Sequence, residues 1–561
     1  MICAARPLRP PFQSLVRAYA PLAAWCLVSL GAASAQAQLR IVTYNTATGN
    51  PGGGVQTARA GAATVLEAIG LESKMGIAKP IDVLLLQEQY TVQISTQSFA
   101  DEMNDIYNTG VYQRGTLNAL TSSLNRSGGG PGIVFNSAAV ELLEEIRFGL
   151  VSDDHQPRSA MRYKLRPVGY GDDAIFYVYN DHYKSDTGLE NEARRLEEAQ
   201  AVRANADTLG DGAHVLYVGD FNIQSASDDM YQWLTSDGPG KAYDSIDQTA
   251  SWHNSNTLRW THTQSPVATG AGGLTGGGID DRFDFQLVTA AFDDGLGLSI
   301  IDGTYRAFGN NGTHVCCGSS IDTGTGASPA VLGALMTASD HLPVVADYQL
   351  PAIMQAIAGN VSASLELGQT FSLDVVVANA ANVVTAIGAD LLRYSLTTSG
   401  DLSGAFLNRT DAALGDGNLH LVGFDTSTLG PKSGTIQIAS TSQQVANGLI
   451  NIPVNYTVIA AGIPGDYNGN GGGDAADYTV WRDSLNASVA TGTGADGSPD
   501  GVVNSADYDV WRANFGAMTG GAARTAVPEP HLTATLFAIL FAGAVAYCRK
   551  PGHELRLSYE R

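Results

Sequence analysis

The chain has 561 residues, of which 44% are hydrophobic and 16% are charged, so it is too long to fold around one compact core. Its formal net charge of -23 argues against broad, non-specific adhesion to nucleic acid, although it leaves open an enzyme that must release its product. The acidic balance favours solubility and calcium binding, and we expect several domains.

The N-terminal segment has the pattern of an export signal. Three arginines precede an apolar stretch over residues 20–33, and Ala33-Ser34-Ala35-Gln36-Ala37 offers two overlapping small-x-small cleavage sites. We therefore predict a signal peptide over residues 1–37 and an exported protein, extracellular or on the cell surface. The alternative is an uncleaved membrane anchor, for which the apolar run is short.

The cysteines are few. Cys3 and Cys26 lie in the predicted signal, Cys548 lies near the end of the sequence, and Cys316 and Cys317 form an adjacent pair in a glycine-rich loop. No disulfide framework follows from so small a number, and the adjacent pair is either bonded or free.

Residues 38–350 predict a mixed α/β domain, because strand-like apolar runs alternate with helical patterns. One such pattern predicts a helix over residues 189–209, with a charged face and an apolar face formed by Leu196, Ala199 and Val202. Loops at strand ends carry chemistry on a rigid scaffold. Five polar motifs, four of which adjoin an apolar run, are therefore expected at one site: Leu86-Gln87-Glu88, Asn180-Asp181-His182, Gly219-Asp220-Phe221-Asn222, Arg282-Phe283-Asp284 and Ser339-Asp340-His341.

The order of these motifs resembles that of the endonuclease/exonuclease/phosphatase family, the deoxyribonuclease-like fold, over essentially all of residues 39–350. The resemblance implies a four-layer α-β-β-α sandwich, in which two β-sheets pack face to face with helices outside. It also implies a hydrolase that cleaves phosphodiester bonds with an activated water and a divalent cation, Mg²⁺ or Mn²⁺.

Three residues are the candidate ligands of that cation. Glu88 ends a buried apolar run, where a carboxylate needs a counter-charge, and hard cations prefer carboxylate oxygens and water. The resemblance matches Asn45 to the family's first-strand asparagine beside the metal, and Asp340 to the last carboxylate of the site.

Five residues are the candidate catalytic groups. Asp220 is placed to position and deprotonate the attacking water, and Asn222 would orient that water or a phosphate oxygen. His341 would donate to the phosphoryl oxygen as charge develops, and Asp284 would fix its tautomer and favour its charged form. The resemblance matches His182 to the second family imidazole, which stabilises the phosphate or protonates the leaving oxygen.

A local basic group stands out in this acidic chain. Arg162, Lys164 and Arg166 alternate, so on a strand they would share one face, and Arg158 precedes them. A solvated face is at least as plausible as a phosphate-binding one, and Arg158 is the candidate phosphate ligand.

The composition changes after Pro351. Over residues 359–461 charged residues are sparse, and short alternating runs such as Phe371–Val377 lie between Gly, Ser, Thr and Asn. This pattern predicts a β-sandwich that serves as a spacer or a binding module.

Residues 465–516 contain an internal repeat, in which Asp477-Tyr478 and Trp481-Arg482 recur 30 residues later. Each copy places oxygen-bearing side chains at positions 1, 3, 5, 9 and 12 of a calcium loop, with glycine at position 6, where the turn demands it. The two sets are Asp466, Asn468, Asn470, Asp474 and Asp477, and Asp496, Ser498, Asp500, Asn504 and Asp507. The repeat resembles a type I dockerin, which implies Ca²⁺ and a cohesin-like partner. Gly472, Gly473 and a neutral position 5 predict a weaker first site.

The C-terminal end resembles a PEP-CTERM sorting signal. After a linker over residues 517–526, the segment 527–550 carries a Pro-Glu-Pro motif, an apolar run over residues 532–547 and the basic pair Arg549-Lys550. The apolar run is marginal for a stable span, so we expect membrane association before processing; an ordinary anchor is the alternative.

The sequence leaves three functions open. A secreted metal-dependent nuclease leads, and a lipid phosphodiesterase or inositol-type phosphatase is the alternative, because one fold hosts all of these substrates. A non-catalytic surface scaffold or adhesion protein would have lost the motif residues, and none is missing.

Overall fold

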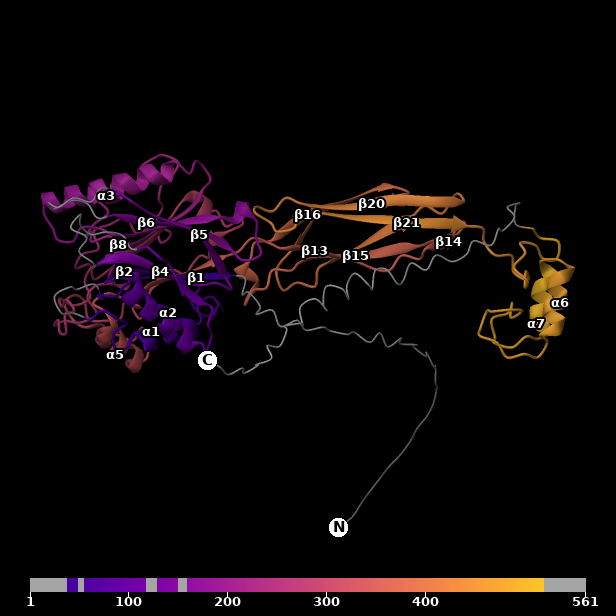
Figure 1. The fold of residues 1–561 in the computed structure, drawn as a ribbon, viewed down its shortest axis with the longest axis horizontal. Helices are drawn as coiled ribbons and strands as arrows, with labels where there is room; N and C mark the ends of the chain where they lie inside the picture. The colour runs from indigo at the N-terminus through magenta and orange to yellow at the C-terminus, as the bar shows by residue number, and fades with distance from the viewer. Residues whose placement is uncertain (1–37, 49–54, 118–128, 150–158, 519–561) are drawn as a thin grey trace, which may run out of the picture.

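The computed structural model describes residues 38–48, 55–117, 129–149 and 159–518. The predicted signal peptide, the PEP-CTERM-like segment, nearly all of the predicted linker, and Arg158 lie outside these residues. Figure 1 shows an α/β domain, then a β-rich part, then a small helical part in a row along the long axis.

Two sheets form the centre of the α/β domain. The first has the order β10-β12-β1-β2-β4-β3, with β11 paired to β12, and the second has the order β5-β6-β7-β8-β9. The strands of the first sheet are β1 Gln38–Asn45, β2 Val83–Gln89, β3 Tyr112–Arg114, β4 Gly130–Asn136, β10 Ser299–Ile300, β11 Arg306–Ala307 and β12 Val344–Gln349. Those of the second are β5 Val140–Phe148, β6 Ala160–Pro167, β7 Phe176–His182, β8 His214–Asp220 and β9 Asp284–Val288.

Helices cover the outer face of each sheet. Figure 1 shows α3 over the second sheet, and α1, α2 and α5 under the first. The helices are α1 Ala62–Leu71, α2 Gln97–Ile106, α3 Leu189–Asp207, α4 Asp229–Leu234 and α5 Pro329–Ala338. Short turns of helix are η1 Val92–Thr96, η2 Asp172–Ala174, η3 Arg259–Thr261, η4 Ala290–Phe292, η5 Ile321–Thr323 and η6 Ala386–Gly388.

Three hydrophobic cores hold these layers together. Ile41 and Leu85 of the first sheet pack with Val178 and Leu216 of the second between the sheets, and separate clusters lie under the helices on each outer face. Because strands β1 and β8 are buried on both faces, every residue in them is buried, which explains their long apolar runs. These layers fit the sandwich that the resemblance implies.

Helix α3 is present where the sequence predicts it, but the prediction of its charged face was wrong. Arg194, Arg195 and Glu198 are buried, because they are paired rather than solvated. Arg195 lies 2.9 Å from the carboxylate of Asp228, and Glu198 accepts a hydrogen bond from the backbone of Lys184.

Two further sheets follow the α/β domain and share one core. Their orders are β13-β15-β19-β17 and β14-β21-β20-β16-β18, and Val375, Val377, Leu396, Ile436 and Tyr456 pack between them. The strands are β13 Met354–Ala358, β14 Ser364–Glu366, β15 Ser372–Asn379, β16 Leu392–Gly400, β17 Leu402–Ser403, β18 Arg409–Asp411, β19 Asn418–Phe424, β20 Gly430–Ser440 and β21 Leu449–Ile459.

This β-rich part is docked onto the α/β domain. The backbone of Val384 donates to Gln38 Oε1 at 3.0 Å, and the backbone of Leu298 donates to Gln444 Oε1 at 2.7 Å. Apolar side chains from beyond residue 350 belong to the core between the catalytic sheets, namely Ala381, Val383, Ala389 and Ala413. Residues 38–350 therefore do not close their own core.

The repeat forms two similar loop-helix units, with α6 Ala475–Asp483 and α7 Ser505–Ala513. Each helix begins at a reciprocal capping box. Trp481 Nε1 donates to the carbonyl of Asn504 at 2.8 Å, and Trp511 Nε1 donates to that of Asp474 at 2.8 Å, so each unit holds the other.

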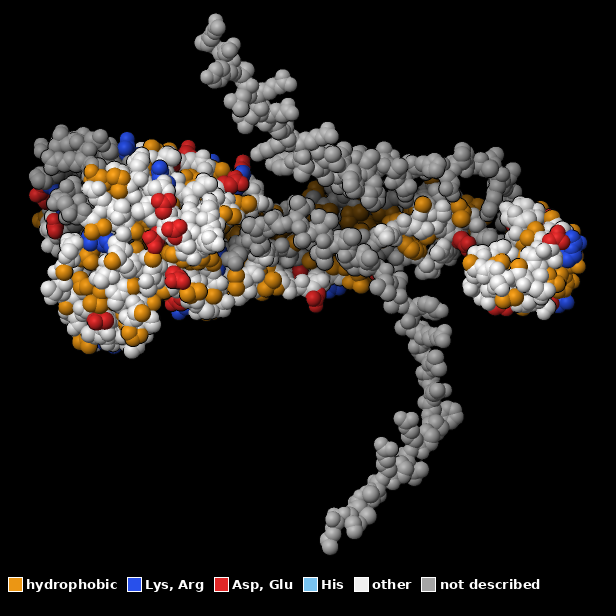
Figure 2. Space-filling view, turned by 60° about the horizontal axis from the view of Figure 1, so that its bottom comes forward, with side chains coloured by type: hydrophobic (Ala, Val, Ile, Leu, Met, Phe, Trp, Pro, Cys, Tyr) orange, Lys and Arg blue, Asp and Glu red, His pale blue; other side chains and the backbone are white. Residues whose placement is uncertain are grey.

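Within the described parts of the chain, none of the helices combines the length and the apolar character that a membrane crossing requires. In the view of Figure 2, acidic and basic side chains lie singly over the described surface of the α/β domain and form no continuous basic patch.

Candidate active site

A pocket of about 500 Å³ opens at the carboxyl ends of β2, β7 and β8. Strand pairing brings the motifs there, because β7 lies parallel to β8 with His182 opposite Asp220, and β9 runs antiparallel to β8 with Asp284 opposite Asp220. Six of the predicted residues line the pocket: Glu88, His182, Asp220, Asn222, Asp340 and His341.

Asn45 links the two sheets at the base of this site. Its Nδ2 donates to Glu88 Oε1 at 3.2 Å and to Asp220 Oδ2 at 3.0 Å, and lies 3.5 Å from His341 Nε2. Asn45 is fully buried, so its amide fixes both carboxylates from below.

The lining of the pocket fits a divalent cation. Glu88, Asp186, Asp220 and Asp340 line it, whereas the described lining residues include no lysine or arginine. Glu88 also has a left-handed backbone, with φ of 55°, next to a break in the β2–β4 register. Such strain clusters at functional sites, and here the carboxylate lines the pocket. Oxygen donors without a fixed counter-charge suit Mg²⁺ or Mn²⁺.

His341 is held by carboxylates on both sides. Its Nδ1 lies 2.8 Å from Asp284 Oδ2, and its Nε2 lies 3.8 Å from Asp220 Oδ2. Burial alone would lower the pKa of His341, but Asp284 and Asp220 outweigh it and hold the pKa well above its ordinary value. The imidazole is therefore kept in its charged form.

Asp220 carries the opposite perturbation. Burial raises its pKa to about 7, the charge of His341 opposes this, and Asp284 and Glu88 raise it further. A carboxyl that titrates near neutrality is suited to accept a proton from water. Glu88 is a candidate cation ligand, and a cation there would lower this pKa, since it favours the carboxylate.

His182 approaches Asp220 from the side opposite to His341. Its Nε2 lies 3.4 Å from Asp220 Oδ2 and 3.9 Å from Glu88 Oε1, while Nδ1 lies 3.2 Å from the carbonyl of Gly129. The carbonyl assigns the proton to Nδ1 and turns Nε2 toward the carboxylates.

Asn222 and Asp340 are each fixed by backbone contacts. Asn222 has a φ of 54°, and its side chain donates to the carbonyl of Tyr183 at 3.1 Å. Asp340 Oδ2 accepts from the backbone N–H of Thr275 at 2.7 Å. The structure thus brings all eight predicted metal and catalytic residues together, and Arg158 lies outside the described residues.

Sequence reasoning missed the contribution of the glycine-rich segment. Thr275, Gln264 and Gln224 also line the pocket, and Thr275 acts through its backbone, which leaves no signal in a side-chain pattern.

The basic group on β6 lies elsewhere. Arg162 pairs with Glu144 at 2.5 Å and Arg166 with Glu141 at 2.6 Å, and neither arginine lines the pocket. Of the two interpretations left open, the structure therefore favours the solvated face for these residues.

The two predicted calcium loops have the same internal geometry. Asp466 accepts from the backbones of Asn470 and Gly471 at 3.0 and 2.8 Å, as Asp496 does from Asp500 and Gly501 at 3.1 and 2.9 Å. Gly471 and Gly501 have positive φ values of 89° and 82°, as position 6 requires. Asn468 and Ser498 donate backbone hydrogen bonds to the buried carboxylates of Asp477 and Asp507.

Among solved structures, the chain is similar to an endonuclease/exonuclease/phosphatase from Bacteroides vulgatus, with 15% identity, coverage of 56% of this chain and 100% of that chain, and a TM-score of 0.36. It is also similar to the human Nocturnin catalytic domain, with 14% identity, coverage of 56% and 95%, and a TM-score of 0.33. A mannosyl-6-phosphatase from Bacteroides thetaiotaomicron gives 15%, 55% and 99%, and 0.32. No curated protein matches the chain.

The family model described as "Endonuclease/Exonuclease/phosphatase family" matches residues 42–490. This match extends past the predicted boundary at residue 350, through the docked β-rich part and into the repeat. It covers most of the sequence and confirms the family resemblance that the five motifs carry. The chain therefore belongs to the endonuclease/exonuclease/phosphatase family.

Proposed function

We propose that this chain is an exported, metal-dependent phosphodiesterase whose substrate is a nucleic acid. The observation that carries the proposal is the position of Asp220, whose carboxylate contacts Asn45 and lies between His182 and His341 in a pocket rich in oxygen donors. A water beside Asp220 would be oriented for attack by one group and flanked by two imidazoles.

The side chains divide the chemistry between them. Asp220 accepts the proton of the attacking water, and Asn222 orients that water or a phosphate oxygen. His341, kept charged by Asp284, donates to the phosphoryl oxygen, and His182 stabilises the phosphate or protonates the leaving oxygen. A divalent cation held by Glu88 and Asp340 beside Asn45 would neutralise charge on the phosphate.

The lining of the pocket favours a phosphodiester over the alternatives. Phe283 is the one large apolar side chain among the described lining residues, which argues against an acyl chain of a lipid. A phosphomonoester carries a second negative charge, for which the described lining offers no lysine or arginine. The intact site also argues against an inert scaffold.

The remaining parts support a role in display outside the cell. The two sheets between residues 354 and 459 form a β-sandwich spacer, and the repeat binds two Ca²⁺ and a cohesin-like partner. The sequence signals at both ends support export and membrane association before processing.

The test uses the full chain with DNA, RNA, a chromogenic phosphodiester, sphingomyelin and a phosphomonoester, with Mg²⁺, Mn²⁺ or EDTA. We expect cation-dependent cleavage of nucleic acid that Asp220→Asn and His341→Gln abolish. Arg162→Gln, on the solvated face, is the matched control and should retain activity. Cleavage of sphingomyelin alone would replace nucleic acid by a lipid, and cleavage of no substrate would refute the enzyme.

A further inference from the structure

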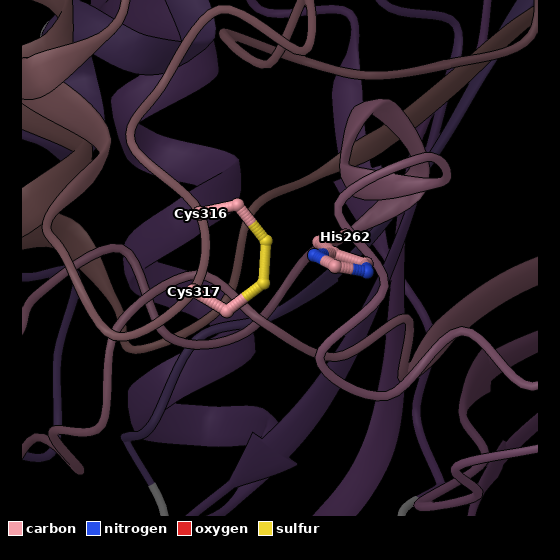
Figure 3. Close-up of side chains that lie close together, drawn as sticks. All are labelled: His262, Cys316 and Cys317. Atoms are coloured by element: carbon pink, nitrogen blue, oxygen red, sulfur yellow. A yellow bond between two sulfur atoms is a disulfide. The ribbon is translucent and has the colours of Figure 1, made fainter.

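Two cysteines and two histidines meet in the loops near residues 262 and 316. Cys316 and Cys317 are bonded to each other, and Figure 3 shows the ring of His262 beside their sulfur atoms, with one ring nitrogen turned toward them. One ligand atom from each of these three residues lies within 4.8 Å of the other two. His262 is fully buried, and the cysteines are half-buried.

The tautomer of His262 suits a metal ligand. Its Nε2 lies 2.6 Å from the carbonyl of Trp252, which assigns the proton to Nε2. Nδ1, 3.4 Å from the carbonyl of Ile279, therefore keeps its lone pair. Burial lowers the pKa of His262, so the ring is neutral. A histidine whose other nitrogen donates to a backbone carbonyl is the usual arrangement at metal sites.

His314, in the same loop as the cysteines, repeats this arrangement. Its Nδ1 lies 3.2 Å from Asn310 Oδ1, which assigns the proton to Nδ1. Its Nε2 is buried and makes no hydrogen bond within the described part of the chain. Burial lowers the pKa of His314 to about 4, with His262 adding to the effect, and the two ring centres lie 6.4 Å apart.

We propose that Cys316, Cys317 and His262, with His314 as the fourth ligand, bind one Zn²⁺ when the disulfide is reduced. A dithiol reductant supplies two electrons and two protons to the Cys316–Cys317 bond and leaves as its own disulfide. Both thiols lose their protons when the cation binds. Two thiolates and two imidazoles are the donor set of structural zinc sites.

The cation would connect segments that the disulfide does not. A bond between adjacent residues closes almost no loop, so it contributes little to restraining the chain. The two segments already pack closely, since a Cβ on Gly278 would lie 2.2 Å from Gly318 and the backbone of Ile279 donates to Ser319 at 3.1 Å. The glycine-rich segment that ends there also supplies Thr275, which holds Asp340.

The test measures binding of Co²⁺ to the full chain, reduced with a dithiol and freed of it without oxygen. We expect one equivalent of Co²⁺ to give the near-ultraviolet absorption of a cobalt–thiolate bond, Zn²⁺ to abolish it, and the oxidised protein to lack it. Reduced protein should also melt at a higher temperature with Zn²⁺ than without.

The variants separate this site from other ligands. Cys316→Ser with Cys317→Ser should abolish the absorption, and His314→Asn should weaken Co²⁺ binding at least tenfold. His253→Gln is the matched control, because His253 pairs with Asp281 in a separate cluster. If reduced wild-type protein shows no absorption, or if it persists without both cysteines, the proposal is wrong. Because His262 is fully buried, His262→Asn is interpreted only if its circular dichroism is unchanged.

Discussion

His341 Nδ1 lies 2.8 Å from Asp284 Oδ2, and both side chains are buried between β8, β9 and the loop after α5. Asp284 stands opposite Asp220 on the neighbouring strand, so one carboxylate acts on the imidazole and the other faces the pocket. This relationship couples the protonation of His341 to the proposed chemistry.

Replacing Asp284 by Asn should change the pH dependence of activity. Burial lowers the pKa of His341, and Asp284 is the strongest of the groups that raise it. Without that carboxylate, His341 loses its proton at lower pH, so the alkaline limb of kcat/KM should move to lower pH. We expect kcat/KM at the optimum to fall by about 100-fold. An alkaline limb that stays in place would contradict the assigned role.

The same pair predicts a pH dependence of stability. Because the folded-state pKa of His341 is raised, its contribution is fully present below the unfolded pKa of about 6.5 and is lost as pH rises through the folded pKa. The free energy of unfolding of Asp284→Asn in EDTA, measured with urea, should therefore differ from wild type most at low pH within the window above about pH 5. An equal difference at every pH would show that the pair does not titrate as described.

Replacing Glu88 by Gln should separate cation binding from folding. The pocket gathers several carboxylates without a described lysine or arginine, so loss of one charge removes a ligand and also relieves repulsion. We expect the Mg²⁺ concentration for half-maximal activity to rise by about tenfold or more, and the melting temperature in EDTA not to fall. The control is Glu144→Gln on the solvated face. A lower melting temperature with an unchanged Mg²⁺ requirement would make Glu88 structural.

Truncation after residue 350 should destabilise the α/β domain, whereas truncation after residue 461 should not. The shorter fragment loses Ala381, Val383, Ala389 and Ala413 from its core, together with the contact of Gln38 with Val384. If this contact is worth about 2–3 kcal/mol, the melting temperature should fall by roughly 5–10 °C. Equal melting temperatures would show that the two parts fold independently.

The two repeat copies should bind Ca²⁺ with unequal affinity. The first loop has neutral Asn470 at position 5, whereas the second has Asp500. We expect Asp507→Asn to remove the tighter site and Asp477→Asn the weaker one, read by the fluorescence of Trp481 and Trp511. A single class of site that both variants weaken equally would contradict this order.

The sequence was most informative where an apolar strand stops at a polar residue. Glu88, His182 and Asp220 end buried strands, and period and position alone place them at one sheet edge. It was least informative where burial depends on partners from distant segments. Arg195 of α3 is buried because Asp228 lies opposite it, and no local pattern shows that pairing.

Backbone contacts were equally hidden from the sequence. Thr275 holds Asp340 through its N–H, and Gln38 meets the β-rich part through Val384, more than three hundred residues away. Neither contact requires a particular residue type on the donor side, so composition and spacing carry no trace of it.

The most direct test of the central claim is the rate of Mg²⁺-dependent cleavage of a chromogenic phosphodiester by the wild type and by Asp220→Asn, which keeps the shape of the side chain. We predict a loss of about 1000-fold or more in kcat with unchanged folding, because the amide cannot accept the proton from water. An Asp220→Asn variant that retains wild-type kcat would contradict the proposed site.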